Sequence, residues 1–240
     1  MAARKSLGGA GLPPLADLFS TSEERALEAQ TQERVMMLPV SELHDFPGHP
    51  FQVRDDEEME KLVESITQHG VLMPGLVRPH AAGGYEIVAG HRRKFASMKA
   101  GIREMPVIVR DMDDDTAVIL MVDSNVQREN VLPSEKARAY KMKLDAIKRR
   151  AGRPSKENSR QLVGNFESAE IVGQSAGDSG RQVQRYIRLN ELIPELLEMV
   201  DGNEIKFNPA YELAFLRPEE QAVLYDILQA EEVTPSLSQA

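Results

Sequence analysis

A glycine followed by two arginines at the start of a predicted helix is the feature best suited to chemistry. The segment Gly90-His91-Arg92-Arg93 follows a β-branched run, and the helix it opens closes at Gly101. Gly90 allows the backbone to approach a ligand closely. The unpaired N–H groups of the first helical turn, together with Arg92 and Arg93, suit a polyanion such as a triphosphate. The alternative is a turn with two surface arginines.

Two adjacent helical residues point about 100° apart, so both arginines can serve one ligand only at the very start of the helix. His91 lies between them and Gly90. No second His and no Cys stands close to it in the sequence. We therefore do not expect His91 to hold zinc.

A second group of polar side chains lies between two predicted helices. Asn125, Gln127, Arg128 and Glu129 place amide, cationic and acidic groups within about one helical turn. Such a mixture can contact a base, a ribose and a phosphate. The alternative is a helix-capping network, in which the same side chains satisfy backbone groups.

A third candidate site is a basic amphipathic helix in the C-terminal half. Residues 171–173, a polar turn over 174–178 and a helix from Ser179 form a helix–turn–helix pattern, anchored by Val183, Tyr186 and Ile187. The outward-facing side chains would be Ser179, Arg181, Gln182, Gln184, Arg185 and Arg188. Arginine and glutamine make bidentate contacts with guanine and adenine in the major groove. The alternative is an ordinary solvated helix.

Alternating short strands and helices would position the first two groups. Met59, Leu62, Val63 and Ile66 repeat at helical spacing and predict a helix after Asp55 or Asp56 that ends at Gly70. A short strand followed by a turn is expected over 35–43, strands at 75–78, 85–89 and 105–112, and further helices at 90–101 and 113–126. This order indicates a compact α/β or α+β domain.

The rest of the chain is predicted to be helical. A helix over 134–150, capped by Ser134, carries an apolar stripe that includes Tyr140 and Leu144. A polar loop is expected over 151–165. Later helices are expected at 168–174, 179–191, 194–200, 209–215 and 218–229.

The charge of the chain is unevenly distributed. The net charge is −9, yet residues 134–188 carry 13 basic and 6 acidic side chains between two acidic segments. Such an asymmetry is typical of a polyanion-binding module. No apolar run approaches the roughly 20 residues that span a bilayer, and the absence of cysteine excludes disulfides. We expect a cytoplasmic protein without membrane association.

With these motifs in place, the chain resembles the ParB family of bacterial DNA-partition proteins, the ParB/RepB/nucleoid-occlusion group. The resemblance covers roughly residues 37–228 and rests on the Gly-His-Arg-Arg box and on Asn-x-Gln-Arg-Glu-x-x-x-Pro-x-Glu-x-Ala from Asn125 to Ala137. It implies an α+β ParB/sulfiredoxin-like nucleotide-binding domain followed by an all-α helix–turn–helix domain. The expected organisation is a flexible tail (1–35), the nucleotide-binding domain (36–132), the DNA-binding domain (133–230) and the start of a linker or truncated region (231–240).

The resemblance also implies a function. The family binds CTP with Mg²⁺, closes as a homodimer into a clamp that slides on double-stranded DNA from a centromere-like site, and works with a ParA-type ATPase. The implied location is cytoplasmic and nucleoid-associated, and the implied DNA-binding residues are those of the predicted basic helix. The implied nucleotide-binding residues are Gln52, Arg54, Gly90, His91, Arg92, Arg93, Asn125, Gln127 and Arg128.

Three positions depart from the family pattern. Met73 replaces a usual glutamine, His91 a usual glutamate and Ser124 a frequent acid. We therefore expect nucleotide binding with at most weak CTP hydrolysis, and we assign no catalytic residue and no metal ligand.

Two other functions stay open at this point. One is a sequence-specific transcriptional regulator or nucleoid-occlusion factor with a degenerate nucleotide pocket. The other is an enzyme, a nuclease or a sulfiredoxin-like phosphotransferase. The missing cysteine and the lack of clustered carboxylates argue against the enzyme.

Overall fold

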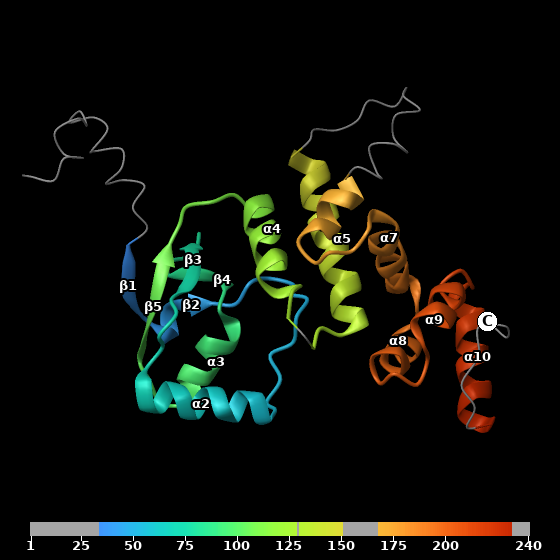
Figure 1. The fold of residues 1–240 in the computed structure, drawn as a ribbon, viewed down its shortest axis with the longest axis horizontal. Coiled ribbons are helices and arrows are strands. Elements are labelled where there is room, and N and C mark those ends of the chain that lie inside the picture. Colours follow the sequence, from blue (N-terminus) through green and yellow to red (C-terminus); the bar gives the residue numbers. More distant parts are fainter. Residues whose placement is uncertain (1–33, 129, 151–167, 232–240) are drawn as a thin grey trace, which may run out of the picture. The chain divides into compact units, whose positions relative to one another are not determined.

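A computed structural model describes residues 34–128, 130–150 and 168–231 of the chain. Within them, five strands form one mixed sheet in the order β1-β5-β3-β4-β2 (Figure 1). The strands are β1 (Val35–Pro39), β2 (Leu43–His44), β3 (Gly75–Pro79), β4 (Tyr85–Ala89) and β5 (Glu104–Val109). Neighbouring pairs β1–β5 and β3–β4 are antiparallel, whereas β5–β3 and β4–β2 are parallel.

The sheet is held by a core of alternating apolar residues. Val77, Ile87 and Val107 are fully buried, one from each of three neighbouring strands. The strands predicted at 75–78, 85–89 and 105–112 are confirmed, although β5 already ends at Val109. The short strand and turn predicted over 35–43 are confirmed as β1 and a 3-10 turn (Val40–Glu42), and the short strand β2 then begins at Leu43.

Three helices accompany the sheet: α2 (Glu57–His69), α3 (His91–Lys99) and α4 (Asp114–Asn125). Asp56 accepts the Met59 N–H at 2.9 Å and Asp113 accepts that of Thr116 at 2.7 Å, so both helices begin at a side-chain cap. Helix α2 packs against α3, and α4 packs against β4. The predicted helices are confirmed here.

A long helix, α5 (Pro133–Arg150), packs against α4 and against α7 (Gly180–Arg188). Tyr140 and Leu144 of α5 share one core with Val183 of α7. The prediction that Ser134 caps α5 is wrong. Pro133 already occupies the first helical turn, and the buried Ser134 donates its N–H and its hydroxyl to Asp201 at 3.0 and 2.5 Å.

The chain enters α7 through a tight turn. Residues 168–174 are helical, and a Cβ atom added at Gly173 would lie 2.0 Å from the Asp178 carbonyl oxygen, so this crossing requires glycine. Ser179 caps α7 by accepting the Gln182 N–H at 3.2 Å. Val183 is fully buried, as predicted, and Tyr186 and Ile187 are partly buried.

Three further helices follow a 3-10 turn (Leu189–Glu191): α8 (Pro194–Asp201), α9 (Phe207–Leu213) and α10 (Pro218–Glu231). They form a second core with Leu189. Helix α9 begins two residues before the predicted start. Most of the predicted tail and the predicted loop over 151–165 fall outside the described residues. No described helix combines the length and apolar character needed to cross a bilayer.

Candidate functional site

A cavity of about 410 Å³ opens where the loop before α2, the first turn of α3 and the connection between α4 and α5 meet. This volume lies within the range of small-molecule pockets. Four predicted nucleotide-binding residues line it: Gln52, Arg54, Arg92 and Arg128. The other lining residues are Asp56, Glu58, Asn130, Val131, Leu132 and Glu135. We call this the arginine cavity.

The arginine cavity is lined by as many carboxylates as arginines, but not every arginine is paired with one. Arg92 lies 3.3 Å from Glu58 and 3.7 Å from Asp56, and Arg54 lies 3.9 Å from Glu135. Arg128 forms no ion pair with any described residue. Burial and then the charge of Arg92 lower the pKa of Arg128. An anion with several charged oxygens would relieve this repulsion, because charge-assisted contacts to arginine are among the strongest hydrogen bonds.

Glu135 is a residue of this site that sequence reasoning left without a role. Its carboxylate is buried, and its two oxygens accept the N–H groups of Gln52 at 2.8 Å and Leu132 at 3.1 Å. It thereby ties the loop carrying Gln52 and Arg54 to the start of α5. Its place in the Asn125–Ala137 motif was the signal that could have identified it.

Gly90 and Arg93 shape the turn before α3 but do not line the arginine cavity. Gly90 has φ +111°, and a Cβ atom there would lie 3.2 Å from Arg93 Nη2 and 3.3 Å from Gly75 Cα. Arg93 Nη1 donates to the carbonyl oxygens of Met73 and Pro74, both at 2.6 Å. Arg93 therefore secures the segment before β3, and burial lowers the pKa of its guanidinium.

His91 also points away from the arginine cavity. Its ring is buried, with its centroid 3.8 Å from that of His49, and neither ring nitrogen bonds any described residue. Burial, followed by the nearby His49, lowers the pKa of His91 to about 3. The imidazole is therefore neutral at pH 7. Both rings line a separate cavity of about 490 Å³ that includes Asp45.

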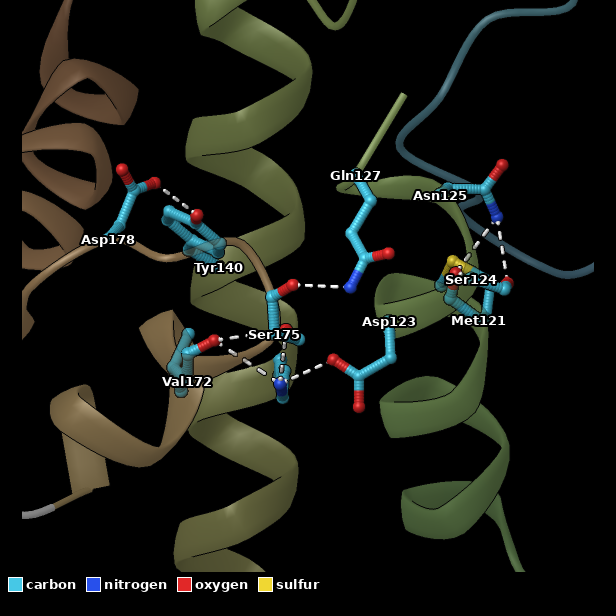
Figure 2. Close-up of polar contacts among 10 residues, drawn as sticks. Met121, Asp123, Ser124, Asn125, Gln127, Tyr140, Val172, Ser175 and Asp178 are labelled. Carbon is cyan, nitrogen blue, oxygen red and sulfur yellow. Dashed lines mark hydrogen bonds and ion pairs between the residues drawn. The ribbon is translucent and has the colours of Figure 1, made fainter. Parts of the chain in front are cut away.

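The structure places Asn125 and Gln127 in two separate groups of polar contacts outside the arginine cavity (Figure 2). Asn125 Nδ2 donates to Met121 O at 2.9 Å and to Ser124 Oγ at 3.2 Å, as the capping alternative described. Gln127 Nε2 donates to Ser175 O at 2.6 Å and thus reaches the turn before α7. Glu129 lies outside the described residues.

The predicted DNA-binding side chains are carried by α7 and its cap. Ser179 and Arg181 are exposed, and Gln182 and Gln184 are half-buried. Arg185 and Arg188 are also half-buried, and both lie against aromatic rings of residues 207–215. The six residues therefore run along α7 from its N-cap to its last residue, and four of them are partly enclosed.

The carboxylates near the arginine cavity are Asp56, Glu58 and Glu135. Among the described residues, no group of three or more His, Cys, Asp or Glu side chains is arranged to hold a metal. Mg²⁺ accompanying a nucleotide needs only one or two carboxylates besides the phosphates. Asp56 and Glu58, both at the cavity mouth beside Arg92, are the residues that could supply them.

Comparison with known proteins places these features in a family. A family model described as the ParB N-terminal domain matches residues 24–126. The chromosome-partitioning protein Spo0J of Thermus thermophilus is 34% identical over 200 residues, which cover 82% of this chain and 67% of that protein. The probable chromosome 1-partitioning protein ParB of Deinococcus radiodurans is 39% identical, with 59% and 48% covered.

A nucleoid occlusion protein of Listeria monocytogenes is 29% identical, with 88% of this chain and 69% of the relative covered. The aligned part of the chain spans between about half and about two thirds of the length of these three relatives.

Solved structures are also similar over most of the chain. Among them is a C-terminally truncated ParB from Caulobacter crescentus complexed to the centromeric parS site, with 26% identity, a TM-score of 0.52 and coverage of 85% of this chain and 95% of that one. The same protein complexed with CTP-γ-S aligns with a TM-score of 0.38, which is too low for that complex to place a ligand in this chain.

Proposed function

The chain belongs to the ParB family, and from that premise we propose that it is a DNA-binding partition protein that binds CTP with Mg²⁺ at the arginine cavity. The observation that carries the proposal is the convergence of Arg54, Arg92 and Arg128, from three separate segments, on one cavity. The overlap of this cavity with the two family boxes supports a triphosphate as the anion.

Within the proposal, each part of the site has a role. Arg54, Arg92 and Arg128 would hold the phosphate chain, with Gln52 at the edge of the cavity. Arg93 and Gly90 would fix the turn that presents the N–H groups of α3. Residues 36–132 would form the nucleotide-binding part.

Residues 133–230 would carry the DNA-binding part. We propose that the helix of residues 168–174, the turn and α7 act as a helix–turn–helix, with α7 entering the major groove of a centromere-like site. The similarity to the Caulobacter protein complexed with parS supports this assignment. A homodimer that closes into a sliding clamp, and a ParA-type ATPase as partner of the tail, complete the proposal and make the protein nucleoid-associated.

Isothermal titration tests the nucleotide part. CTP, ATP and the hydrolysis-resistant CTP-γ-S would each be titrated with Mg²⁺ into the wild-type chain and into Arg128→Ala. We expect selective CTP binding. In Arg128→Ala we expect a loss of about 2 kcal/mol, roughly 30-fold in Kd, as for a charge-assisted hydrogen bond.

The matched control is Arg103→Ala, because Arg103 is exposed and lies outside the arginine cavity. It removes the same charge and should leave CTP binding unchanged. Equal losses in both variants would assign the effect to net charge alone, and no binding of any nucleotide to the wild-type chain would refute the nucleotide part of the proposal.

One observation favours a second candidate, a nucleoid-occlusion factor or DNA-binding regulator without nucleotide turnover. His91 is buried against His49, and the Met73 side chain is 72% exposed, so neither family-deviating side chain is placed to orient water at the arginine cavity. Under this candidate, retention of the protein on closed DNA circles would be the same with and without CTP. CTP-dependent retention supports the clamp.

A further inference from the structure

An aromatic ladder lies beside the arginines of α7. Phe207, Tyr211 and Phe215 are spaced four residues apart along α9 and its C-terminal end, although the whole chain has only 12 Phe and Tyr residues. Residues four apart share one helical face. The Tyr211 and Phe215 rings meet edge to face, with centroids 5.2 Å apart.

The ladder holds two of the predicted DNA-binding side chains. Arg185 Cζ lies 5.0 Å from the centre of the Phe207 ring and 4.7 Å from that of Tyr211, and Arg188 Cζ lies 4.2 Å from that of Phe215. Arg185 Nη2 also donates to Asn208 Oδ1 at 2.7 Å. The guanidinium of Arg185 is thus fixed by two rings and an amide oxygen.

These arginines are held without being neutralised. Residues 189–240 carry 11 acidic side chains, yet neither Arg185 nor Arg188 forms an ion pair with a described residue. Contact with a ring face leaves the charge and the edge of the guanidinium available, and a guanidinium edge is the group that contacts guanine O6 and N7.

We propose that Tyr211, Phe207 and Asn208 are positioning residues that hold Arg185 in the orientation needed to read a guanine, and that Phe215 does the same for Arg188. The inference rests on the proposed function, because it takes α7 as the helix that enters the major groove. An arginine held in place before binding loses less side-chain entropy on contact with the base.

The test compares two substitutions at one ring. The probe is the duplex that the full wild-type chain selects from a randomised DNA pool, together with a panel in which each G·C pair is replaced in turn by A·T. Fluorescence anisotropy gives the affinity for each duplex, and discrimination is the ratio of the affinity for the selected duplex to that for the duplex with one pair replaced. In Tyr211→Leu we expect the discrimination at one G·C pair to fall by about tenfold, as when a bidentate contact is weakened. Tyr211→Phe keeps the ring and should retain the wild-type ratio.

The controls separate positioning from folding. Asn208 is exposed, so Asn208→Ala provides a second variant that leaves the helix core intact. Thermal melting should be unchanged in it, while discrimination falls at the same base pair as in Tyr211→Leu. Arg185→Lys should lose discrimination at that pair as well, because lysine lacks the planar fork.

The failures of the two proposals are distinguishable. The wild-type chain could enrich a sequence while Tyr211→Leu and Asn208→Ala still discriminate among base pairs as well as the wild type. This result would overturn the positioning role but not the DNA-binding function. A pool without any enriched sequence would overturn the proposed site-specific function and this inference with it.

Discussion

Among single residues, Arg93 illustrates how one side chain organises a turn. Its Nη1 atom donates to both Met73 O and Pro74 O at 2.6 Å. In Arg93→Ala, the partly buried carbonyl group of Pro74 and the exposed one of Met73 lose a charged donor, so we expect the free energy of unfolding to fall by about 2 kcal/mol. Urea denaturation measures this change.

The adjacent Arg92 is a matched control. Among the described residues its ion-pair partners are the exposed carboxylates Asp56 and Glu58, at 3.7 and 3.3 Å, and surface pairs contribute about 0–1 kcal/mol. Arg92→Ala should therefore unfold at nearly the wild-type urea concentration. If Arg92→Ala were as destabilising as Arg93→Ala, the two carbonyl contacts would not be the cause.

For single residues, the sequence predicted which kinds of side chain form the site better than it predicted the direction in which each side chain points. The angle of about 100° between neighbouring helical residues accounts for Arg92 entering the arginine cavity while Arg93 turns to Met73. It could not show that His91 would turn toward His49, or Gln127 toward Ser175. Those directions depend on partners 42 and 48 residues away in the chain, which local spacing does not reveal.

Between elements, a buried lysine connects α4, α5 and the turn before α7. Lys143 is 3% exposed, and its Nζ atom lies 2.5 Å from Asp123 Oδ1, 3.1 Å from Ser175 Oγ and 3.2 Å from Val172 O. In Asp123→Ala the ammonium stays buried without its carboxylate. We expect a loss of about 3 kcal/mol in the free energy of unfolding, measured by urea denaturation.

A control pair joins the same two helices. Asp115 of α4 pairs with Arg149 of α5 at 2.6 Å, but the Arg149 side chain is 59% exposed, so Asp115→Ala should cost less than about 1 kcal/mol. The double variant Asp123→Ala/Lys143→Met removes both charges and should recover most of the stability. A double variant no more stable than Asp123→Ala would contradict the buried-charge explanation.

Elements with local signals were the predictable ones. The side chains of Asp56 and Asp113 fix where α2 and α4 begin, and apolar periodicity fixes their buried faces. The pairing of β1 with β5 depends on residues about 70 positions apart, and no local pattern specifies it. The cap of α5 was wrongly assigned to Ser134 because the partner of Ser134, Asp201, lies 67 residues further along the chain.

For the molecule as a whole, the charge pattern separates the two proposed sites. The basic segment 134–188 contains α7, whereas the arginine cavity lies mainly in an acidic segment and depends on local convergence of cations. Composition therefore predicted the basic helix but not the cavity, which only the fold of residues 52–135 assembles. The burial of His91 within this fold can be tested through the pH dependence of the free energy of unfolding.

Protonation of His91 should make the stability of the whole protein depend on pH. Burial lowers the pKa of His91 to about 3, against about 6.5 in an unfolded chain. Below pH 6.5 the imidazole of His91 binds a proton in the unfolded state but not in the folded state. The free energy of unfolding therefore decreases as the pH falls from 6.5 toward 3. The expected slope is about 1.4 kcal/mol per pH unit, which amounts to about 2 kcal/mol between pH 6.5 and pH 5.

Urea denaturation of the wild-type chain and His91→Leu at half-unit steps from pH 7.5 to pH 5 isolates this term. Leucine cannot titrate, so the difference in free energy of unfolding between the two proteins should be constant above pH 6.5 and should shift in favour of His91→Leu below it. His49 contacts His91, and burial also lowers its pKa, but it remains in both proteins and its own proton uptake largely cancels. Parallel curves down to pH 5 would show that His91 accepts a proton in the folded state, and hence that its ring is not enclosed as described.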